Sequence, residues 1–203
     1  MLLNKLKREN KMQIKSLMSN NFLSNTFIVE NNNKCLIFDC GASVRNVKQL
    51  INNCEVEAIF ITHGHFDHIY NLDEYVKAFN CDVFCTEKCF EKFKNADKNL
   101  SNYFLNNSLI LNQNNYMEVK NEVEIKVANL IIKPYILTGH SNCSVAYKIE
   151  NNLICGDIIF KNGVGRTDFY DSNPNQQEKS INKIKMLAPL NVYCGHGENF
   201  NLR

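Results

Sequence analysis

Residues 62–68 read Thr62-His63-Gly64-His65-Phe66-Asp67-His68 and follow the apolar run Ala58-Ile59-Phe60-Ile61. The segment places three imidazoles and one carboxylate within six positions. The other two histidines, His140 and His196, each follow a glycine that comes after another apolar run. Every histidine of the chain therefore occurs where the end of a strand would bring it to a shared edge.

The spacing within this segment predicts how its side chains are directed. Successive side chains of an extended segment alternate between two faces, so His63 and His65 point the same way and can hold one metal ion. The adjacent Asp67 and His68 can both join that edge only if the chain turns there into a helix. Such a helix is predicted by the apolar residues Leu72, Tyr75, Val76 and Phe79. The segment thus predicts two metal positions, with a solvated histidine-rich turn as the alternative.

Three further candidate ligands, His140, Asp157 and His196, each come directly after a glycine. Glycine allows the backbone to turn sharply and to direct the next side chain off a strand end. A single dipeptide of this kind is more often a turn than a ligand, but the set repeats one design. An aspartate can bridge two ions that histidines hold on either side, and Asp157 is the candidate for that place.

The ligand types indicate which metals the site would take. Neutral imidazole and carboxylate groups suit zinc, iron or manganese. The histidine-rich segment of residues 62–68 contains no cysteine, which argues against a closed structural zinc site. We therefore expect two divalent metal ions as cofactors, with zinc as the first choice and iron or manganese as alternatives.

Four strings occur in a fixed order along the chain: THGHFDH, TGHS, CGDIIF and CGHGE. In this order they resemble the metallo-β-lactamase superfamily of metallohydrolases, and the resemblance covers residues 12–203. Gly163-Val164-Gly165-Arg166-Thr167-Asp168-Phe169 is similar to the short forms of the glyoxalase II branch, the hydroxyacylglutathione hydrolases. The resemblance implies an α+β fold, a four-layer αββα sandwich.

The resemblance also implies a role for each candidate ligand. His63, His65 and His140 would hold the first metal, and Asp67, His68 and His196 the second, with Asp157 bridging. Asp67 and Asp157 are the carboxylates to which it gives a catalytic role, because a hydroxide held between the two ions would attack the substrate carbonyl. Asp39 and Thr62 are expected to orient ligands and not to bind metal themselves.

Two residues near the Gly-Arg-Thr-Asp string are candidates for substrate binding. The resemblance places the Arg166 guanidinium close to the metals, where it suits a substrate carboxylate. A structural salt bridge with Asp168 is the alternative for this side chain. Tyr170 is a second candidate contact.

These features favour an enzyme that hydrolyses a small thioester such as S-lactoylglutathione. Three alternatives stay open: a persulfide dioxygenase with one iron, a lactonase or β-lactamase of the same superfamily, and a non-enzymatic binding module. The module is disfavoured because every ligand position is present. The ending Cys194-Gly195-His196-Gly197 resembles the hydrolase more than the dioxygenase.

Apolar runs predict the organisation of residues 12–203 as one hydrolase domain after an N-terminal tail, residues 1–11. Strands are predicted at Gln13–Leu17, Phe22–Glu30, Lys34–Phe38, Ala58–Ile61, Met117–Val119, Val123–Val127, Ile131–Leu137, Ser144–Ile149 and Leu153–Cys155. Helices are predicted over Val44–Asn53, after His68, and after Ser172, which would be the N-cap with Pro174 in the first turn. The polar stretch Lys94–Asn107 is predicted to be a loop or lid.

Composition narrows the class of partner. A formal charge of +2 is too small to indicate a nucleic-acid partner. The short basic stretch Met1–Arg8 is far from a membrane span, so we expect no membrane association. Nine cysteines, an odd number without a secretory signal, favour a reducing cytoplasm over a disulfide framework.

Overall fold

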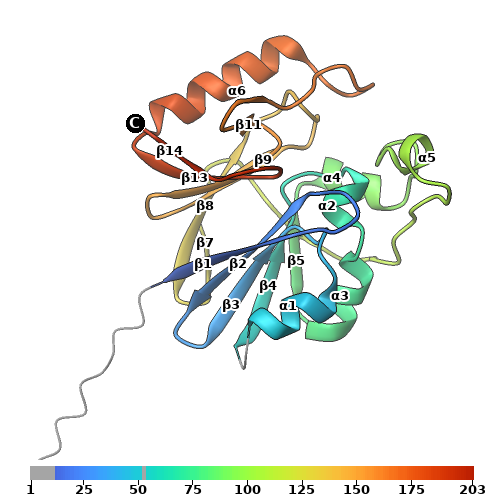
Figure 1. The fold of residues 1–203 in the computed structure, drawn as a ribbon, viewed down its shortest axis with the longest axis vertical. Helices are drawn as coiled ribbons and strands as arrows, with labels where there is room; N and C mark the ends of the chain where they lie inside the picture. The colour runs from blue at the N-terminus through green and yellow to red at the C-terminus, as the bar shows by residue number, and fades with distance from the viewer. Residues whose placement is uncertain (1–11, 52–53) are drawn as a thin grey trace, which may run out of the picture.

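The computed structural model describes residues 12–51 and 54–203. Two six-stranded sheets pack against each other, and helices cover their outer faces (Figure 1). The first sheet contains, in spatial order, β1 (Gln13–Met18), β2 (Asn25–Asn31), β3 (Lys34–Phe38), β4 (Glu55–Phe60), β5 (Asp82–Cys85) and β6 (Met117–Glu118). The second contains β14 (Phe200–Leu202), β13 (Leu190–Cys194), β10 (Asn152–Gly156), β9 (Val145–Ile149), β8 (Leu130–Ile136) and β7 (Ile125–Val127).

Helices and a short hairpin complete the described part of the chain. The helices are α1 (Val44–Leu50), α2 (Phe66–Ile69), α3 (Leu72–Phe79), α4 (Glu87–Phe93), α5 (Ser101–Phe104) and α6 (Pro174–Met186). The hairpin pairs β11 (Ile159–Phe160) with β12 (Gly163–Val164). This is the αββα sandwich that the sequence predicted. No helix in the described residues is both long and apolar enough to cross a bilayer.

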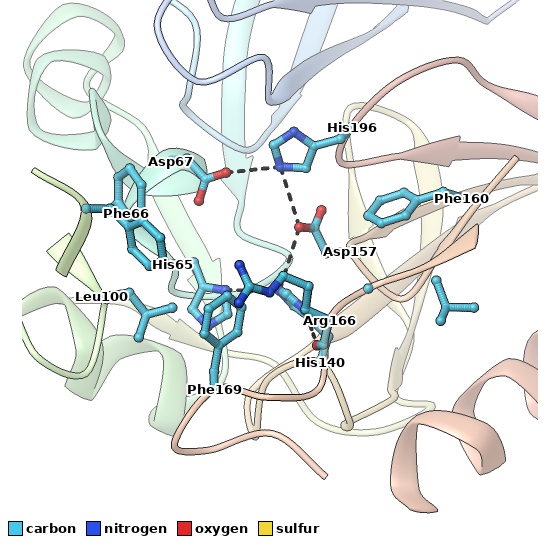
Figure 2. A pocket seen from close by; sticks show the side chains of 13 residues that line it. His65, Phe66, Asp67, Leu100, His140, Asp157, Phe160, Arg166, Phe169 and His196 are labelled. Carbon is cyan, nitrogen blue, oxygen red and sulfur yellow. Dashed lines mark hydrogen bonds and ion pairs between the residues drawn. The ribbon is translucent and has the colours of Figure 1, made fainter. Parts of the chain in front are cut away.

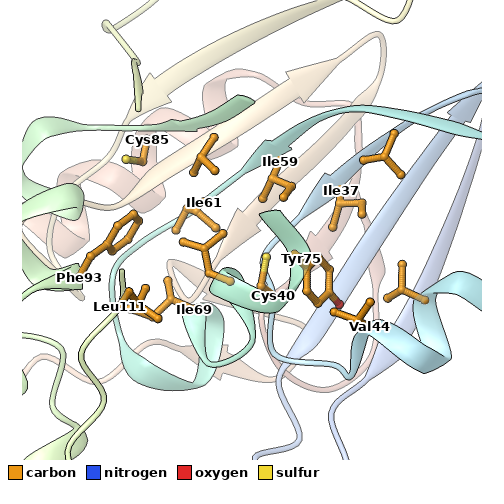
Figure 3. Close-up of a cluster of buried hydrophobic side chains, with 14 of the residues drawn as sticks. Ile37, Cys40, Val44, Ile59, Ile61, Ile69, Tyr75, Cys85, Phe93 and Leu111 are labelled. Carbon is orange, nitrogen blue, oxygen red and sulfur yellow. The ribbon is translucent and has the colours of Figure 1, made fainter. Parts of the chain in front are cut away.

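Three buried clusters correspond to the three interfaces between the four layers. Side chains alternate along each strand, so Ile37 of β3 packs toward the helices while its neighbour Phe38 packs toward the second sheet. Figure 3 shows the outer cluster of the first sheet, where Tyr75 of α3 and Val44 of α1 cover Ile37 and Ile59. The buried Tyr75 hydroxyl donates to the carbonyl of Ala42 over 2.9 Å, which satisfies its only polar atom.

The central cluster joins the two sheets through stacked aromatic rings. Phe60 of β4 lies 4.9 Å from Phe38 and 4.7 Å from Phe84, measured between ring centroids. Tyr147 of β9 contacts Phe60 from the other sheet, and its hydroxyl donates to the carbonyl of Ile61 over 2.9 Å. This contact fixes the end of β4 against the second sheet, directly before the histidine-rich segment. The third cluster packs Ile184 of α6 against the outer face of the second sheet.

Several predicted boundaries differ from the observed ones. β2 begins at Asn25 and not at Phe22, because residues 20–22 form a turn and Leu23 has a φ of 59°. The helix expected after His68 begins earlier, at Phe66, and is split into α2 and α3. The N-cap of α6 is Asn173 and not Ser172: its side chain accepts from the amide of Gln176 over 3.0 Å.

Two predictions fall partly or wholly outside the described residues. The helix expected over Val44–Asn53 is α1, which ends at Leu50, and residues 52–53 are not described. The N-terminal basic tail, residues 1–11, is not described either. The stretch predicted as a loop or lid, Lys94–Asn107, consists of turns around the short helix α5.

Candidate metal centre

The seven candidate ligands lie at one edge of the sandwich, where strands of both sheets end. Strands β3, β4 and β5 run parallel in the first sheet, and β10 runs parallel to β13 in the second. Parallel strands finish at the same edge, so the segments that follow them meet there. His63 comes after β4, Asp157 after β10 and His196 after β13.

The histidine-rich segment turns as its spacing predicted. His65 is the N-cap of α2 and keeps an extended backbone, with φ −76° and ψ 147°. Asp67 and His68 lie in the single turn of α2, which directs both toward the ligand cluster. His140 reaches the cluster through Gly139, whose φ of 144° and close approach to Gln177 leave no room for a Cβ atom.

A first group consists of His63, His65 and His140, each of which offers one ring nitrogen within 4.8 Å of the others. Nε2 of His140 lies 3.0 Å from Nδ1 of His65. The opposite nitrogen of His140, Nδ1, donates to the carbonyl of Arg166 over 2.9 Å. All three imidazoles are buried. Three nitrogens with this spacing match the imidazole set of a catalytic zinc site.

A second group consists of Asp67, His68 and His196. An Asp67 carboxylate oxygen lies 3.0 Å from Nε2 of His196 and 3.5 Å from Nε2 of His68. Asp157 faces both groups: its Oδ1 lies 3.4 Å from His68 Nε2, and its Oδ2 lies 3.6 Å from His140 Nε2. Figure 2 shows this carboxylate between His196 and His140. Its position is the one predicted for a bridging ligand.

Unsatisfied polar atoms test whether the cluster fits metal ions. Nε2 of His63, Nε2 of His68 and Oδ1 of Asp157 are buried and have no hydrogen-bond partner. Buried polar atoms without partners are rare because each one costs about 1–3 kcal/mol. Divalent ions would satisfy all three at once. The donor set therefore fits two divalent metal ions.

Asp39 and Thr62 support the cluster from behind. Oδ2 of Asp39 accepts from Nδ1 of His68 over 2.8 Å and from the Thr62 hydroxyl over 2.7 Å. Its Oδ1 accepts from the Thr62 amide over 2.8 Å. A carboxylate on Nδ1 fixes the proton there and leaves Nε2 of His68 free to bind a metal. The Thr62 hydroxyl also lies 3.1 Å from Nδ1 of His63.

Burial and charge set the protonation of the ligands. Burial lowers the pKa of His63 well below its ordinary value and the pKa of His65 to about 4, so both are neutral at pH 7. Burial acts to lower the pKa of His68 as well, but the Asp67 and Asp157 carboxylates outweigh it and raise that pKa. Burial acts to raise the pKa of Asp157, and His68 outweighs it and holds that pKa low. The carboxylates therefore stay ionised as ligands.

A cavity of about 300 Å³ opens above the cluster (Figure 2). Its floor contains His65, Asp67, His140, Asp157 and His196. Its walls are mostly apolar and consist of Phe66, Leu100, Phe104, Phe160, Val164, Gly165, Arg166 and Phe169. A cavity of this size admits a small molecule directly onto the ligand groups.

The family model of the Metallo-beta-lactamase superfamily matches residues 20–196, most of the chain. The protein belongs to this superfamily. "Probable metallo-hydrolase YqgX" of Bacillus subtilis (strain 168) is 27% identical over 180 residues, which are 86% of this chain and 85% of that protein. A probable metallo-hydrolase is thus among the relatives of the chain.

Two further similarities concern the activity and the fold. A hydroxyacylglutathione hydrolase of Buchnera aphidicola subsp. Schizaphis graminum (strain Sg) is 28% identical over 88% of this chain and 62% of that enzyme. The crystal structure of BLEG-1 B3 metallo-beta-lactamase superposes with a TM-score of 0.89 and 25% identity, and the match covers 94% of each chain. The metallo-β-lactamase fold thus accounts for nearly the whole chain.

The two candidate substrate residues, Arg166 and Tyr170, have different surroundings. Arg166 lines the cavity, and its guanidinium lies 4.7 Å from the centroid of the Phe169 ring. It donates two hydrogen bonds to Asp168, over 2.8 and 2.7 Å, which is the salt bridge considered as the alternative. Tyr170 is not part of the cavity lining, and its hydroxyl donates to the carbonyl of Lys98. Its neighbour Phe169 lines the cavity instead, where the loop bends.

Sequence reasoning missed the role of three residues that lie behind the first ligand group. Lys92 and Asp171 form a buried ion pair next to His65. Ser172, predicted to be a helix cap, donates its hydroxyl to the carbonyl of His140 over 2.5 Å. The spacing of the motifs carries no signal for them, since Lys92 lies on a helix and the other two lie in a loop. Only the proximity of Asp171 and Ser172 to the Gly-Arg-Thr-Asp string pointed to this region.

Proposed function

We propose that the protein hydrolyses a small thioester, of the kind represented by S-lactoylglutathione, at a centre of two divalent metal ions. The observation that carries this proposal is Asp157, whose two carboxylate oxygens face the two ligand groups at the floor of the cavity. The Gly-Arg-Thr-Asp string and the similarity to a hydroxyacylglutathione hydrolase support a thioester in particular.

The proposed reaction needs no side-chain nucleophile. When bound, two divalent ions lower the pKa of a water molecule to about 7 and polarise the substrate carbonyl. His63, His65 and His140 would hold one ion, and Asp67, His68 and His196 the other, with Asp157 shared. Asp39 contacts Nδ1 of His68, and Thr62 contacts Nδ1 of His63, which orients both rings for metal binding through Nε2. We propose zinc as the metal, with iron or manganese as the alternatives.

The cavity walls narrow the class of thioester. Among the described residues, Arg166 is the one lysine or arginine that lines the cavity, and it already forms a salt bridge with Asp168. The remaining wall residues are apolar, and Phe66, Phe104 and Phe169 lie beside one another over the first ligand group. Such walls favour an uncharged, apolar acyl group beside the reacting carbonyl. A phenylacetyl thioester is therefore a better probe of the site than a substrate with a charged acyl group.

Metal analysis paired with a thioester assay tests the proposal. Protein purified without chelator should contain close to two metal ions per chain and should hydrolyse S-lactoylglutathione or a phenylacetyl thioester. Asp157→Ala should lower the content of both ions and abolish hydrolysis, whereas Asp73→Ala, which removes a half-buried carboxylate outside the ligand groups and the cavity lining, should change neither. A fully metallated protein that turns over no acyl thioester would contradict the proposal.

The fold similarity to BLEG-1 favours β-lactam hydrolysis as a second candidate. A chromogenic cephalosporin in the same assay distinguishes the two activities directly. A persulfide dioxygenase is distinguished by one tightly held iron, no zinc, and consumption of oxygen.

We propose a cytoplasmic setting, a small-molecule partner, and no nucleic acid or membrane; the nine cysteines are all unpaired in the described structure.

A further inference from the structure

A buried ion pair lies directly beneath the first ligand group. Nζ of Lys92, on α4, lies 2.6 Å from Oδ2 of Asp171, in the loop before α6. Both side chains are only 2% exposed. Removing a lysine and an aspartate from water costs several kcal/mol per ion, so a pair at this depth calls for an explanation beyond stability.

The two oxygens of Asp171 have different surroundings. Oδ2 accepts from Lys92 over 2.6 Å, from the Ser141 hydroxyl over 2.9 Å and from the Asn142 amide over 3.0 Å. Oδ1 is buried and has no hydrogen-bond partner. Nε2 of His65 is also buried without a partner, and it lies 4.0 Å from this oxygen. The two unsatisfied atoms face each other across a gap that a small rotation of the imidazole would close.

We propose that Asp171, held by Lys92, positions His65 by accepting a hydrogen bond from its Nε2–H, which leaves Nδ1 of His65 to bind the first metal ion. The inference rests on the metal centre proposed above. Nδ1 is the nitrogen that faces His140, at 3.0 Å, inside the first ligand group. A carboxylate behind a metal-binding imidazole fixes both the tautomer and the ring orientation.

The glycine of the histidine-rich segment makes room for this pair. A Cβ atom at Gly64 would lie 2.9 Å from the Cβ and Cδ atoms of Lys92. The aliphatic part of the Lys92 side chain can therefore pack against the backbone between His63 and His65 only because residue 64 is glycine. The close approach carries the ammonium group to Asp171, and the Gly64 amide donates to the Cys143 sulfur over 3.4 Å.

The loop that contains Asp171 also supports a second ligand of the same group. Ser172 donates to the carbonyl of His140, and the Asn173 amide donates to the carbonyl of Gly139 over 2.7 Å. Three consecutive residues thus hold two of the three histidines of the first group. The carboxylate that supports the second group is Asp39 instead, so a different carboxylate lies behind each ligand group.

Charge states agree with this geometry. Burial acts to raise the pKa of Asp171, but its interactions with His65 and Lys92 outweigh burial and hold that pKa below its ordinary value. Burial acts to lower the pKa of Lys92, and Cys143 and Asp171 outweigh it and raise that pKa. Both groups are therefore charged at neutral pH, and Asp171 can only accept hydrogen bonds.

The test compares two replacements of Asp171. In Asp171→Asn the single amide oxygen is drawn to the three donors at Oδ2, so the NH₂ group faces His65 and favours the tautomer with the proton on Nδ1. We expect the affinity for the first zinc ion to fall roughly 10–100-fold, while the second ion stays bound. The double variant Lys92→Met/Asp171→Leu removes the pair without leaving a buried charge, and it should also weaken the first ion selectively.

Nitrogen NMR of the zinc-loaded wild-type protein should show a protonated Nε2 on His65, and this signal should be lost or shifted in both variants. Lys15→Met/Glu30→Leu removes a part-buried ion pair far from the cluster and should leave zinc affinity unchanged. Folded Asp171 variants that bind two zinc ions with wild-type affinity would overturn the inference. A wild-type protein that binds no metal would instead overturn the proposed function.

Discussion

Asp39 has a backbone conformation that few residues other than glycine adopt, with a φ of 61°. The conformation turns the carboxylate back so that it accepts from Thr62 and His68 together. Strained residues of this kind persist where the surrounding contacts determine them, and they occur often at functional sites. The strain at Asp39 is thus offset by the hydrogen bonds that orient the second ligand group.

We expect Asp39→Asn to weaken binding of the second metal ion roughly 10–100-fold. The NH₂ group of asparagine would have to face one of the donors from which the carboxylate of Asp39 now accepts a hydrogen bond. The loss should also destabilise the fold by about 1–3 kcal/mol. Zinc titration and urea unfolding measure the two effects. Asp73→Asn is the matched control, since Asp73 accepts hydrogen bonds from the loop residue Asn112 at the surface. Equal effects in both variants would argue against an orienting role for Asp39.

Arg166 and Asp168 should have opposite effects on a substrate that carries a carboxylate. Arg166→Ala should raise its KM roughly tenfold with little change in kcat, as expected for binding that is equal in the ground and transition states. Asp168→Ala should lower KM, because it releases the guanidinium from its partner. Steady-state kinetics with S-lactoylglutathione measure both. If KM is unchanged in both variants, Arg166 does not contact the substrate.

The sequence predicted the meeting of the seven candidate ligands but not the residues behind them. Ligand positions follow from strand ends and glycines, which leave a local pattern in the chain. Lys92 and Asp171 meet only because α4 and the loop before α6 pack against each other, and no local pattern records that contact. Tyr170 and Phe169 illustrate the same limit, since a loop gives no period from which to choose the inward side chain.

At the scale of elements, the segment around α5 covers one side of the cavity. Asn99 holds it in place through its side-chain amide, which donates to the carbonyls of Lys92 and Leu109. The segment presents Leu100 and Phe104 to the cavity. The sequence predicted a polar loop or lid here, and its two apolar wall residues were not recognised because most of the residues around them are polar.

Phe104→Ala should raise KM for a phenylacetyl thioester severalfold and leave KM for the acetyl thioester of the same thiol unchanged. The Phe104 side chain is 53% exposed, so its removal should cost little stability. Tyr103→Ala is a matched control, because Tyr103 is 68% exposed, adjacent, and absent from the cavity lining. A comparison of the two acyl thioesters in steady-state kinetics decides the result. Equal changes for both would show that Phe104 does not contact the acyl group.

Helix and strand boundaries show how far local patterns extend. Pro174 and the apolar positions after it located α6, but Ser172 and Asn173 are both good N-caps, and propensity alone does not choose between them. The choice depends on a tertiary contact, since the Ser172 hydroxyl is already engaged by His140. Tertiary contacts likewise shorten β2, whose predicted first residues form a turn next to the bridge between Ser24 and His196.

At the scale of the whole molecule, each candidate metal position draws its candidate ligands from both sheets. The segment after β4 supplies His63, His65, Asp67 and His68, whereas His140, Asp157 and His196 come from segments of the second sheet. The sandwich itself could be predicted because the resemblance implies it and because two β-rich halves, each ending in helices, indicate two packed sheets covered by helices. How the two sheets are placed so that the ligands meet depends on the central aromatic cluster, which the sequence pattern does not specify.

Asp67 and His196 lie 129 positions apart in the chain, yet their side chains are 3.0 Å apart. Contacts between such distant residues form late in folding, because closing a long loop is entropically costly before other contacts exist. Zinc should therefore slow unfolding strongly and change the folding rate little. With free zinc at about 1,000 times its Kd, each bound ion should add about 4 kcal/mol to the free energy of unfolding. Stopped-flow measurements of the folding and unfolding rates, with zinc or with a chelator, test this. If zinc accelerated folding by as large a factor as it slowed unfolding, the cluster would already be formed to a large extent in the transition state.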